Sequence, residues 1–260
     1  MKEAFVDLQT KDGIATITFF HPASNSLPGE ILKKIADTIT QCGADNDVKL
    51  IVLKSEGEKA FCAGASFDEL VAIDDHETGI KFFSGFANVI NAIRKCPKFV
   101  LGRVQGKAVG GGVGIASAVD YCFARDNASI KLSELAVGIG PFVVGPAVER
   151  KVGLSGMSEL AIAAWEWRSA EWALNKGLYQ SIHSSIEELD QAVDAFAQKL
   201  ITYSPEAMRE LKQVFWQGTE NWDSLLLERA GISGDLVRSD FTRNAIAAFK
   251  AAVEKKKQSK

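Results

Sequence analysis

Residues Val100–Asp120 read VLGRVQGKAVGGGVGIASAVD. The pattern predicts a buried strand, a turn without large side chains and a helix made of small residues. Three consecutive glycines, Gly110–Gly112, stand where the strand gives way to the helix, so backbone N–H groups are left bare at the helix start. Partial positive charge collects there, which suits a phosphate or an oxygen that becomes negative during a reaction.

Strands and helices alternate on both sides of this stretch. Apolar and polar residues alternate at Ala4–Thr10 and at Ile14–Phe20, around an Asp-Gly turn, and predict a hairpin. Strand–helix units then repeat as far as Pro146, after which nearly every segment has the apolar spacing of a helix. We therefore predict an α/β fold with a mostly parallel sheet and helices outside it.

Composition excludes several classes of protein. The chain has 260 residues, a net charge of −3 and a pI near 5.7, so no broad basic surface invites nucleic acid. No run approaches the roughly 20 apolar residues of a membrane helix, and no signal peptide is predicted at the N-terminus. The four cysteines form no CxxC pair and are expected to be reduced thiols of a cytoplasmic protein. The three histidines have no metal-ligand spacing.

Two loops of the sequence are alike. Phe61–Ser66 and Gly110–Gly112 each follow a strand, lack bulky side chains and precede a helix. Two such loops offer a pair of N–H groups to one oxygen, which is what a developing oxyanion requires. Glu134 stands nearby in the apolar stretch Ile130–Ile139, where a carboxylate is costly unless it is paired or used. Its alternative role is a helix cap or a buried ion pair.

At these residues the chain resembles the enoyl-CoA hydratase/isomerase family, the crotonase superfamily. The similarity covers about residues 4–257 in order and spacing and is specific only when its motifs are taken together. Those motifs are FCAGA at Phe61–Ala65, VQGKAVGGG at Val104–Gly112, SELAVG at Ser133–Gly138, and His21-Pro22 with Asn25. The triplet does not fit the G-x-G-x-x-G spacing of a dinucleotide site, which argues against that alternative.

The resemblance implies a spiral of strand–strand–helix units and an acyl-CoA thioester substrate, with no separate cofactor because coenzyme A is part of the substrate. It implies that the N–H groups of Ala65 and Gly111 hold the thioester oxygen and that Glu134 moves the proton. Ser24, Leu27, Ala63 and Ser66 are expected to contact coenzyme A. The expected division is a spiral core at residues 1–200 and a helical oligomerisation region at 201–260, which forms a homotrimer or a dimer of trimers.

One departure from the family pattern bears on the reaction. Family hydratases use two glutamates, but the position of the earlier one is occupied here by Gly114. With one carboxylate, a proton shuttle between two carbons needs less machinery than the addition of water. We therefore predict an enoyl-CoA isomerase. The alternatives are a hydratase, including a methylglutaconyl-CoA hydratase-like activity, in which Ser117 or a water supplies the missing role, and a non-catalytic acyl-CoA-binding protein.

The acyl pocket is expected to be lined by Gly114, Phe142 and Trp167. The apolar segment Phe142–Val144 replaces a glycine-rich loop that is common in the family, and an apolar wall would raise the pKa of Glu134. A lysine that often binds the phosphates of coenzyme A is missing after the first loop. Lys250, or the cluster Lys255–Lys257, is the predicted replacement; the other interpretation of that cluster is a solvated helix end.

Overall fold

The computed structural model describes residues 2–248, and the larger of its sheets has six strands. Their order is β1-β2-β4-β7-β9-β12, and all neighbours are parallel except the β1–β2 hairpin. Asp12 and Gly13, with φ of 52° and 82°, form its left-handed turn, as the Asp-Gly signal predicted. The strands are β1 (Phe5–Lys11), β2 (Ile14–Phe20), β4 (Leu50–Ser55), β7 (Val100–Val104), β9 (Tyr121–Arg125) and β12 (Ser181–His183).

A smaller sheet runs in the order β11-β10-β8-β5. It consists of β5 (Ala60–Cys62), β8 (Lys107–Val109), β10 (Ser129–Lys131) and the antiparallel edge strand β11 (Arg168–Ser169); a separate parallel pair joins β3 (Ser26–Leu27) to β6 (Gly64–Ala65). Along the chain, β4, β7 and β9 of the large sheet are each followed by a strand of the small sheet, and the helical elements α2, α4 and η1 come next, with β6 standing before α2. This repetition is the predicted spiral of strand–strand–helix units.

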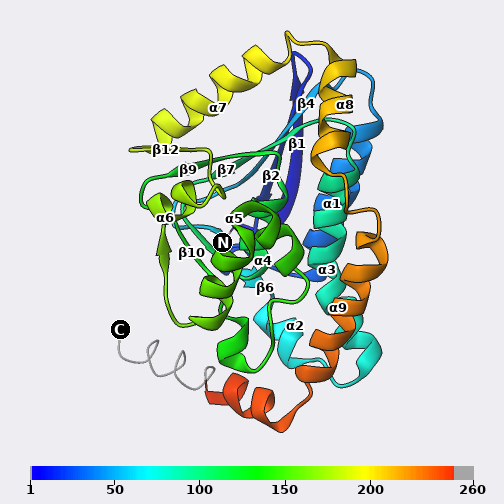
Figure 1. The fold of residues 1–260 in the computed structure, drawn as a ribbon, viewed down its shortest axis with the longest axis vertical. Coiled ribbons are helices and arrows are strands. Elements are labelled where there is room, and N and C mark those ends of the chain that lie inside the picture. The colour runs from blue at the N-terminus through cyan, green and yellow to red at the C-terminus, as the bar shows by residue number, and fades with distance from the viewer. Residues whose placement is uncertain (1, 249–260) are drawn as a thin grey trace.

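Helices cover both faces of the large sheet (Figure 1). On β4, Ile51 and Leu53 pack into the main core together with α1 (Gly29–Ala44) and α3 (His76–Lys95). Leu50 and Val52, which alternate with them, pack on the opposite face against α7 (Ile186–Leu200). A strand that is buried on both faces has a nearly continuous run of apolar residues, and β4 has this pattern in the sequence. The other helices between α1 and α7 are α2 (Phe67–Val71), α4 (Gly111–Ala118), the 3₁₀ turn η1 (Glu134–Val137), α5 (Gly145–Ile162) and α6 (Ala170–Asn175).

The C-terminal helices pack against the same body. In α9 (Trp222–Leu236), Trp222, Leu226 and Ala230 join the main core, and α8 (Pro205–Phe215) places Met208 in the second one. Lys212 of α8 forms a buried ion pair of 2.8 Å with Asp120. Residues 240–248 are helical and follow α9. The division at residue 200 and the trimer stay predictions, and none of the helices among residues 2–248 has the length and apolar character to cross a membrane.

Candidate active site

Three neighbouring strands of the small sheet bring the predicted site residues together. Strands β5, β8 and β10 are adjacent and parallel, with Cys62 opposite Ala108 and Val109 opposite Lys131. Because the carboxyl ends of parallel strands meet at one edge of a sheet, the segments that follow them converge there. Residues Ala63–Ala65 of the first small-residue loop, Gly110 and Gly111 of the triplet, and Glu134 line one cavity of about 600 Å³.

Each glycine of the triplet has its own close neighbour. A Cβ on Gly110, whose φ is +52°, would lie 2.9 Å from Oε1 of Glu134. One on Gly111 would lie 2.2 Å from the ring of Phe86, and one on Gly112 would lie 2.5 Å from the carbonyl oxygen of Cys62. A larger residue would therefore displace the carboxylate, an aromatic ring or the backbone. The triplet is required by packing as well as by access to the backbone.

Ala65 and Gly111 both line the cavity. Gly111 is the first residue of α4, so its N–H has no acceptor within the helix. Ala65 belongs to β6, which pairs with β3 with Leu27 opposite Ala65. The Ser26 hydroxyl donates to the carbonyl of Ala65 at 2.7 Å and holds the backbone there. The two predicted oxyanion donors thus lie on the two loops that the sheet brings side by side.

Glu134 opens η1 beside the glycine triplet. The residue as a whole is half-buried, but its Oε2 atom is buried and has no hydrogen-bond partner. Burial raises the pKa of Glu134 to about 7, and the backbone N–H groups of Glu134 and Ser133 offset only part of that rise. The shift has the direction expected from the apolar sequence around it. A carboxyl with a pKa near neutrality can both accept and return a proton.

The remainder of the cavity wall is mostly apolar. Aromatic side chains come from α3 and from the segment after η1, and the helical segment 240–248 contributes two small or aliphatic residues. The predicted Phe142 is among them, and Glu134 is the only carboxylate among the described residues that line the cavity. These wall residues are Phe67, Leu70, Phe82, Phe83, Phe86, Val137, Ile139, Phe142, Val143, Val144, Ala245 and Ile246.

Gly114, which was expected to line the pocket, is not among the residues that line this cavity. A Cβ at this position would lie 2.5 Å from Cγ1 of Val144 and 3.5 Å from Cδ1 of Ile90. Val144 lines the cavity in its place, so the space of a side chain at position 114 is already filled. Ser117 is buried, its hydroxyl has no hydrogen-bond partner, and it is not among the cavity residues.

Trp167 also lies outside the cavity and is 43% exposed. Its ring faces the ammonium groups of Lys107 and Lys131, and Lys131 does line the cavity. Trp167 directly precedes the edge strand β11, so it stands at the outer side of the small sheet, one strand beyond Glu134.

Of the residues predicted to contact coenzyme A, one lines the cavity and the others do not. Ala63 lines the cavity, but Ser24 is exposed away from it and Leu27 is fully buried in the main core. The Ser66 hydroxyl accepts a hydrogen bond from the N–H of Glu69 and caps α2. Ser26, between two of the predicted residues, is the one that faces the cavity.

Asn25 was noted in the sequence only as part of a motif, and the structure gives it a role in positioning the loop. Its amide donates to the carbonyls of Glu56 and Ala60, and its oxygen accepts from the N–H of His21. Lys250 and Lys255–Lys257 lie outside the described residues. Among residues 2–248 no group of three His, Cys, Asp or Glu is placed to hold a metal ion.

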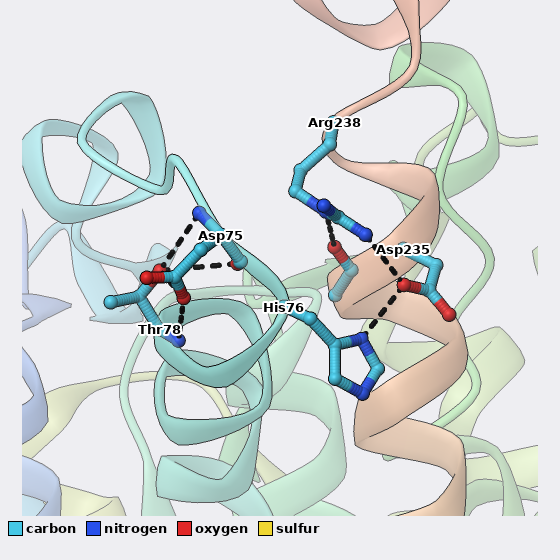
Figure 2. Close-up of polar contacts among 6 residues, drawn as sticks. Asp75, His76, Thr78, Asp235 and Arg238 are labelled. Carbon is cyan, nitrogen blue, oxygen red and sulfur yellow. Dashed lines mark hydrogen bonds and ion pairs between the residues drawn. The ribbon is translucent and has the colours of Figure 1, made fainter.

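A polar junction joins α3 to the end of α9 (Figure 2). The helical segment 240–248, which contributes to the cavity wall, follows it in the chain. His76 Nδ1 lies 2.7 Å from Asp235 Oδ1, which also accepts from Arg238 at 2.9 Å. The helices touch closely here, since a Cβ on Gly79 would lie 2.8 Å from the Cα of Gly234. Beyond the junction, Thr242 packs against Gly138, and Ala245 and Ile246 reach the cavity.

Comparisons with known proteins identify the family of the chain. The profile of the family described as Enoyl-CoA hydratase/isomerase matches residues 9–258. The chain therefore belongs to the enoyl-CoA hydratase/isomerase family, as the motifs predicted.

Two relatives carry different names. A probable enoyl-CoA hydratase of Bacillus subtilis is 27% identical over 97% of this chain and 96% of the relative. A trans-2-decenoyl-[acyl-carrier-protein] isomerase of Streptococcus mutans is 26% identical over 84% of this chain and 85% of the relative. The crystal structure of an enoyl-CoA hydratase from Bacillus halodurans covers 94% of this chain and 99% of its own, with a TM-score of 0.86 and 20% identity. That likeness confirms the predicted crotonase-like fold.

Proposed function

We propose that this protein is an enoyl-CoA isomerase in which Glu134 alone carries the migrating proton. The observation that supports the proposal most directly is the contact of Val144 with Gly114, because it closes the position from which a second acid would act. Glu134 is left as the only carboxylate among the described cavity residues. A single acid that accepts and returns one proton suffices for a shift of a double bond.

The reaction follows from the proposed geometry. The N–H groups of Ala65 and Gly111 hold the thioester oxygen, which lowers the energy of negative charge on it. Glu134 removes a proton from C2 of a 3-enoyl thioester, and the electron pair moves into a dienolate whose charge rests on that oxygen. The protonated Glu134 then returns the proton to C4, and the product is the conjugated 2-enoyl thioester. No proton or electron is gained or lost overall.

Burial suits Glu134 to both halves of this cycle. A pKa of about 7 leaves the carboxyl partly ionised near neutral pH, so it can act as the base. The same shift makes the carboxylate a stronger base than a solvated glutamate, which favours uptake of the C2 proton. The apolar walls of the cavity supply the low dielectric that causes the shift and also receive the hydrocarbon of the acyl chain.

The second candidate is a hydratase in which Glu134 is one acid–base group and a bound water takes the role of the missing second glutamate. It is kept because a relative that spans nearly the whole chain is named a probable enoyl-CoA hydratase. A methylglutaconyl-CoA hydratase-like activity is one form of this alternative. A non-catalytic acyl-CoA-binding protein is the alternative from another class.

One experiment separates the three. Purified protein is given crotonyl-CoA and, separately, a 3-enoyl-CoA, and hydration and isomerisation are followed together with deuterium exchange at C2. Isomerisation well above hydration is expected, with loss of exchange in Glu134→Gln. Hydration at a comparable rate would contradict the isomerase assignment. Tight binding of the thioester without exchange would contradict catalysis altogether.

A further inference from the structure

Two lysines and a tryptophan stand together at one end of the cavity. Lys107 Nζ lies 5.0 Å and Lys131 Nζ lies 5.6 Å from the ring centroid of Trp167. Neither lysine forms an ion pair with a carboxylate of residues 2–248. Two like charges therefore lie beside one aromatic ring, and neither has a carboxylate of the described residues within ion-pair distance.

The small sheet explains why these side chains meet. Lys107 and Val109 lie two residues apart on β8, so they share a face, and Val109 pairs with Lys131 of β10. Ser129 and Ile130 pair with Ser169 and Arg168, and the same register places Trp167 opposite Lys131. The face that carries Val109 and Lys131 is the wall of the cavity, and it continues outward to Lys107 and Trp167.

The ammonium group of Lys131 does not pair with the carboxylate of Glu134, although only two residues separate them in the sequence. The pKa of Glu134 is raised by burial, and only backbone N–H groups lower it. A lysine ammonium beside the carboxylate would lower that pKa as well. The ammonium group of Lys131 instead faces the ring of the half-exposed Trp167. Lys131 therefore lines the cavity, and its charge remains available to an anionic group of a ligand.

We infer that Lys107, Lys131 and Trp167 form a cationic subsite that binds an anionic group of the thioester substrate. The group is a carboxylate at the end of the acyl chain or a phosphate of the carrier. The ring of Trp167 fixes the two ammonium groups, and the anion binds where both can reach it. The inference rests on the proposed thioester substrate but not on the reaction performed on it.

The sheet order sets this subsite apart from the oxyanion donors. Ala65 follows β5 at one edge of the small sheet, whereas Trp167 precedes β11 at the other. Glu134 follows β10, between them. A substrate whose thioester oxygen lies between Ala65 and Gly111 therefore reaches the lysines only with a part beyond the reacting carbons. The subsite recognises the substrate at a distance from the chemistry and is expected to affect binding more than the rate of turnover.

The test measures binding of unreactive, saturated thioesters, so that it does not depend on turnover. Calorimetry compares hexanoyl-CoA, the six-carbon CoA thioester with a terminal carboxylate, and hexanoyl-pantetheine, which has no phosphate. The proteins are the wild type, Lys131→Gln, Lys107→Gln and the control Lys81→Gln, which removes the same charge from an exposed position on α3. A salt series is measured in parallel, because a charge contact weakens as ionic strength rises.

Two outcomes support the subsite and identify the anion. If Lys131→Gln and Lys107→Gln weaken binding of the carboxylate thioester about five- to tenfold and leave hexanoyl-CoA unchanged, the subsite reads the acyl terminus. If the two lysine variants weaken binding of both CoA thioesters equally and leave binding of hexanoyl-pantetheine unchanged, the subsite binds a phosphate. Equal effects on all three ligands, no effect on any, or the same effect in Lys81→Gln would overturn the inference. Absence of isomerisation together with either supporting outcome would remove the proposed reaction and leave the subsite.

Discussion

Replacing Glu134 with glutamine should make the protein more stable at alkaline pH, relative to the wild type, and should greatly reduce its activity. Burial raises the pKa of Glu134 from 4.5 to about 7, so the folded state holds this proton more tightly than the unfolded state. The stability that follows is fully present below the unfolded pKa and is lost as pH rises through the folded value near 7. At 1.36 kcal/mol per pKa unit, the full loss is about 3.4 kcal/mol.

Glutamine stays neutral throughout, so the comparison isolates the ionisation of one group. Between about pH 5 and pH 8.5, the free energy of unfolding of the wild type should fall relative to Glu134→Gln by ~2.5 kcal/mol, because part of the loss has occurred by pH 5. The amide leaves a polar atom unpaired where Oε2 now lies. That cost is the same at every pH and cancels in the difference.

Urea-induced unfolding followed by circular dichroism provides the measurement, at one protein concentration for all variants. Glu228→Gln is the matched control, because Glu228 is exposed on α9 and should show no pH-dependent difference. Turnover by Glu134→Gln should fall by a factor on the order of 10² to 10⁴, the usual contribution of a general acid or base. A difference that does not change with pH, or that changes in the opposite direction, would refute burial as the cause of the raised pKa.

Four further outcomes are expected. The value of kcat/KM should rise with pH and level off above about 7, since ionised Glu134 is the proposed base; a profile that is flat between pH 5 and 8 would contradict this role. Gly111→Ala should lose activity and about 1–3 kcal/mol of stability against the ring of Phe86, whereas Gly231→Ala, with open space around it, should lose neither. Gly114→Glu alone should be destabilised by Val144, and its double variant with Val144→Ala should recover stability and gain hydration of crotonyl-CoA; the two variants unfolding alike would argue against the contact. Asp235→Asn should make the segment 240–248 more sensitive to protease and raise KM, and unchanged cleavage would show that the α3–α9 junction does not hold that segment.

The local parts of the fold were predictable because their signals are local. The Asp-Gly hairpin is fixed by two residues that adopt left-handed backbone angles. The convergence of the two small-residue loops with Glu134 follows from parallel strand order, since each follows a strand of one sheet. Pattern and chain order are sufficient for these features, and both can be read without coordinates.

Features that depend on contacts between distant segments were not predictable in this way. Gly114 was expected in the pocket because of its position after the triplet, but Val144, thirty residues later, covers it. Trp167 was expected to line the acyl pocket, but it precedes an edge strand and stands beside Lys131, outside the lining of the cavity. The aromatic side chains of α3 and the residues of the segment 240–248 were missed because helical periodicity identifies a buried face without identifying what it faces.

The contacts of the glycines suggest that the choice between the two family reactions rests on pairs of residues. Gly110 and Glu134 form one pair, since a Cβ on the first would collide with the carboxylate of the second. Gly114 and Val144 form another, because Val144 fills the space that a second glutamate would need. Restoring an acid at position 114 without reducing residue 144 would therefore force a charged side chain into a packed apolar site, at a cost in both packing and desolvation. A two-acid site can therefore be built only if residue 144 is made smaller before or together with the introduction of an acid at position 114. By the same reasoning, a glycine at 114 combined with a bulky residue at 144 indicates the one-acid reaction more reliably than the glycine alone.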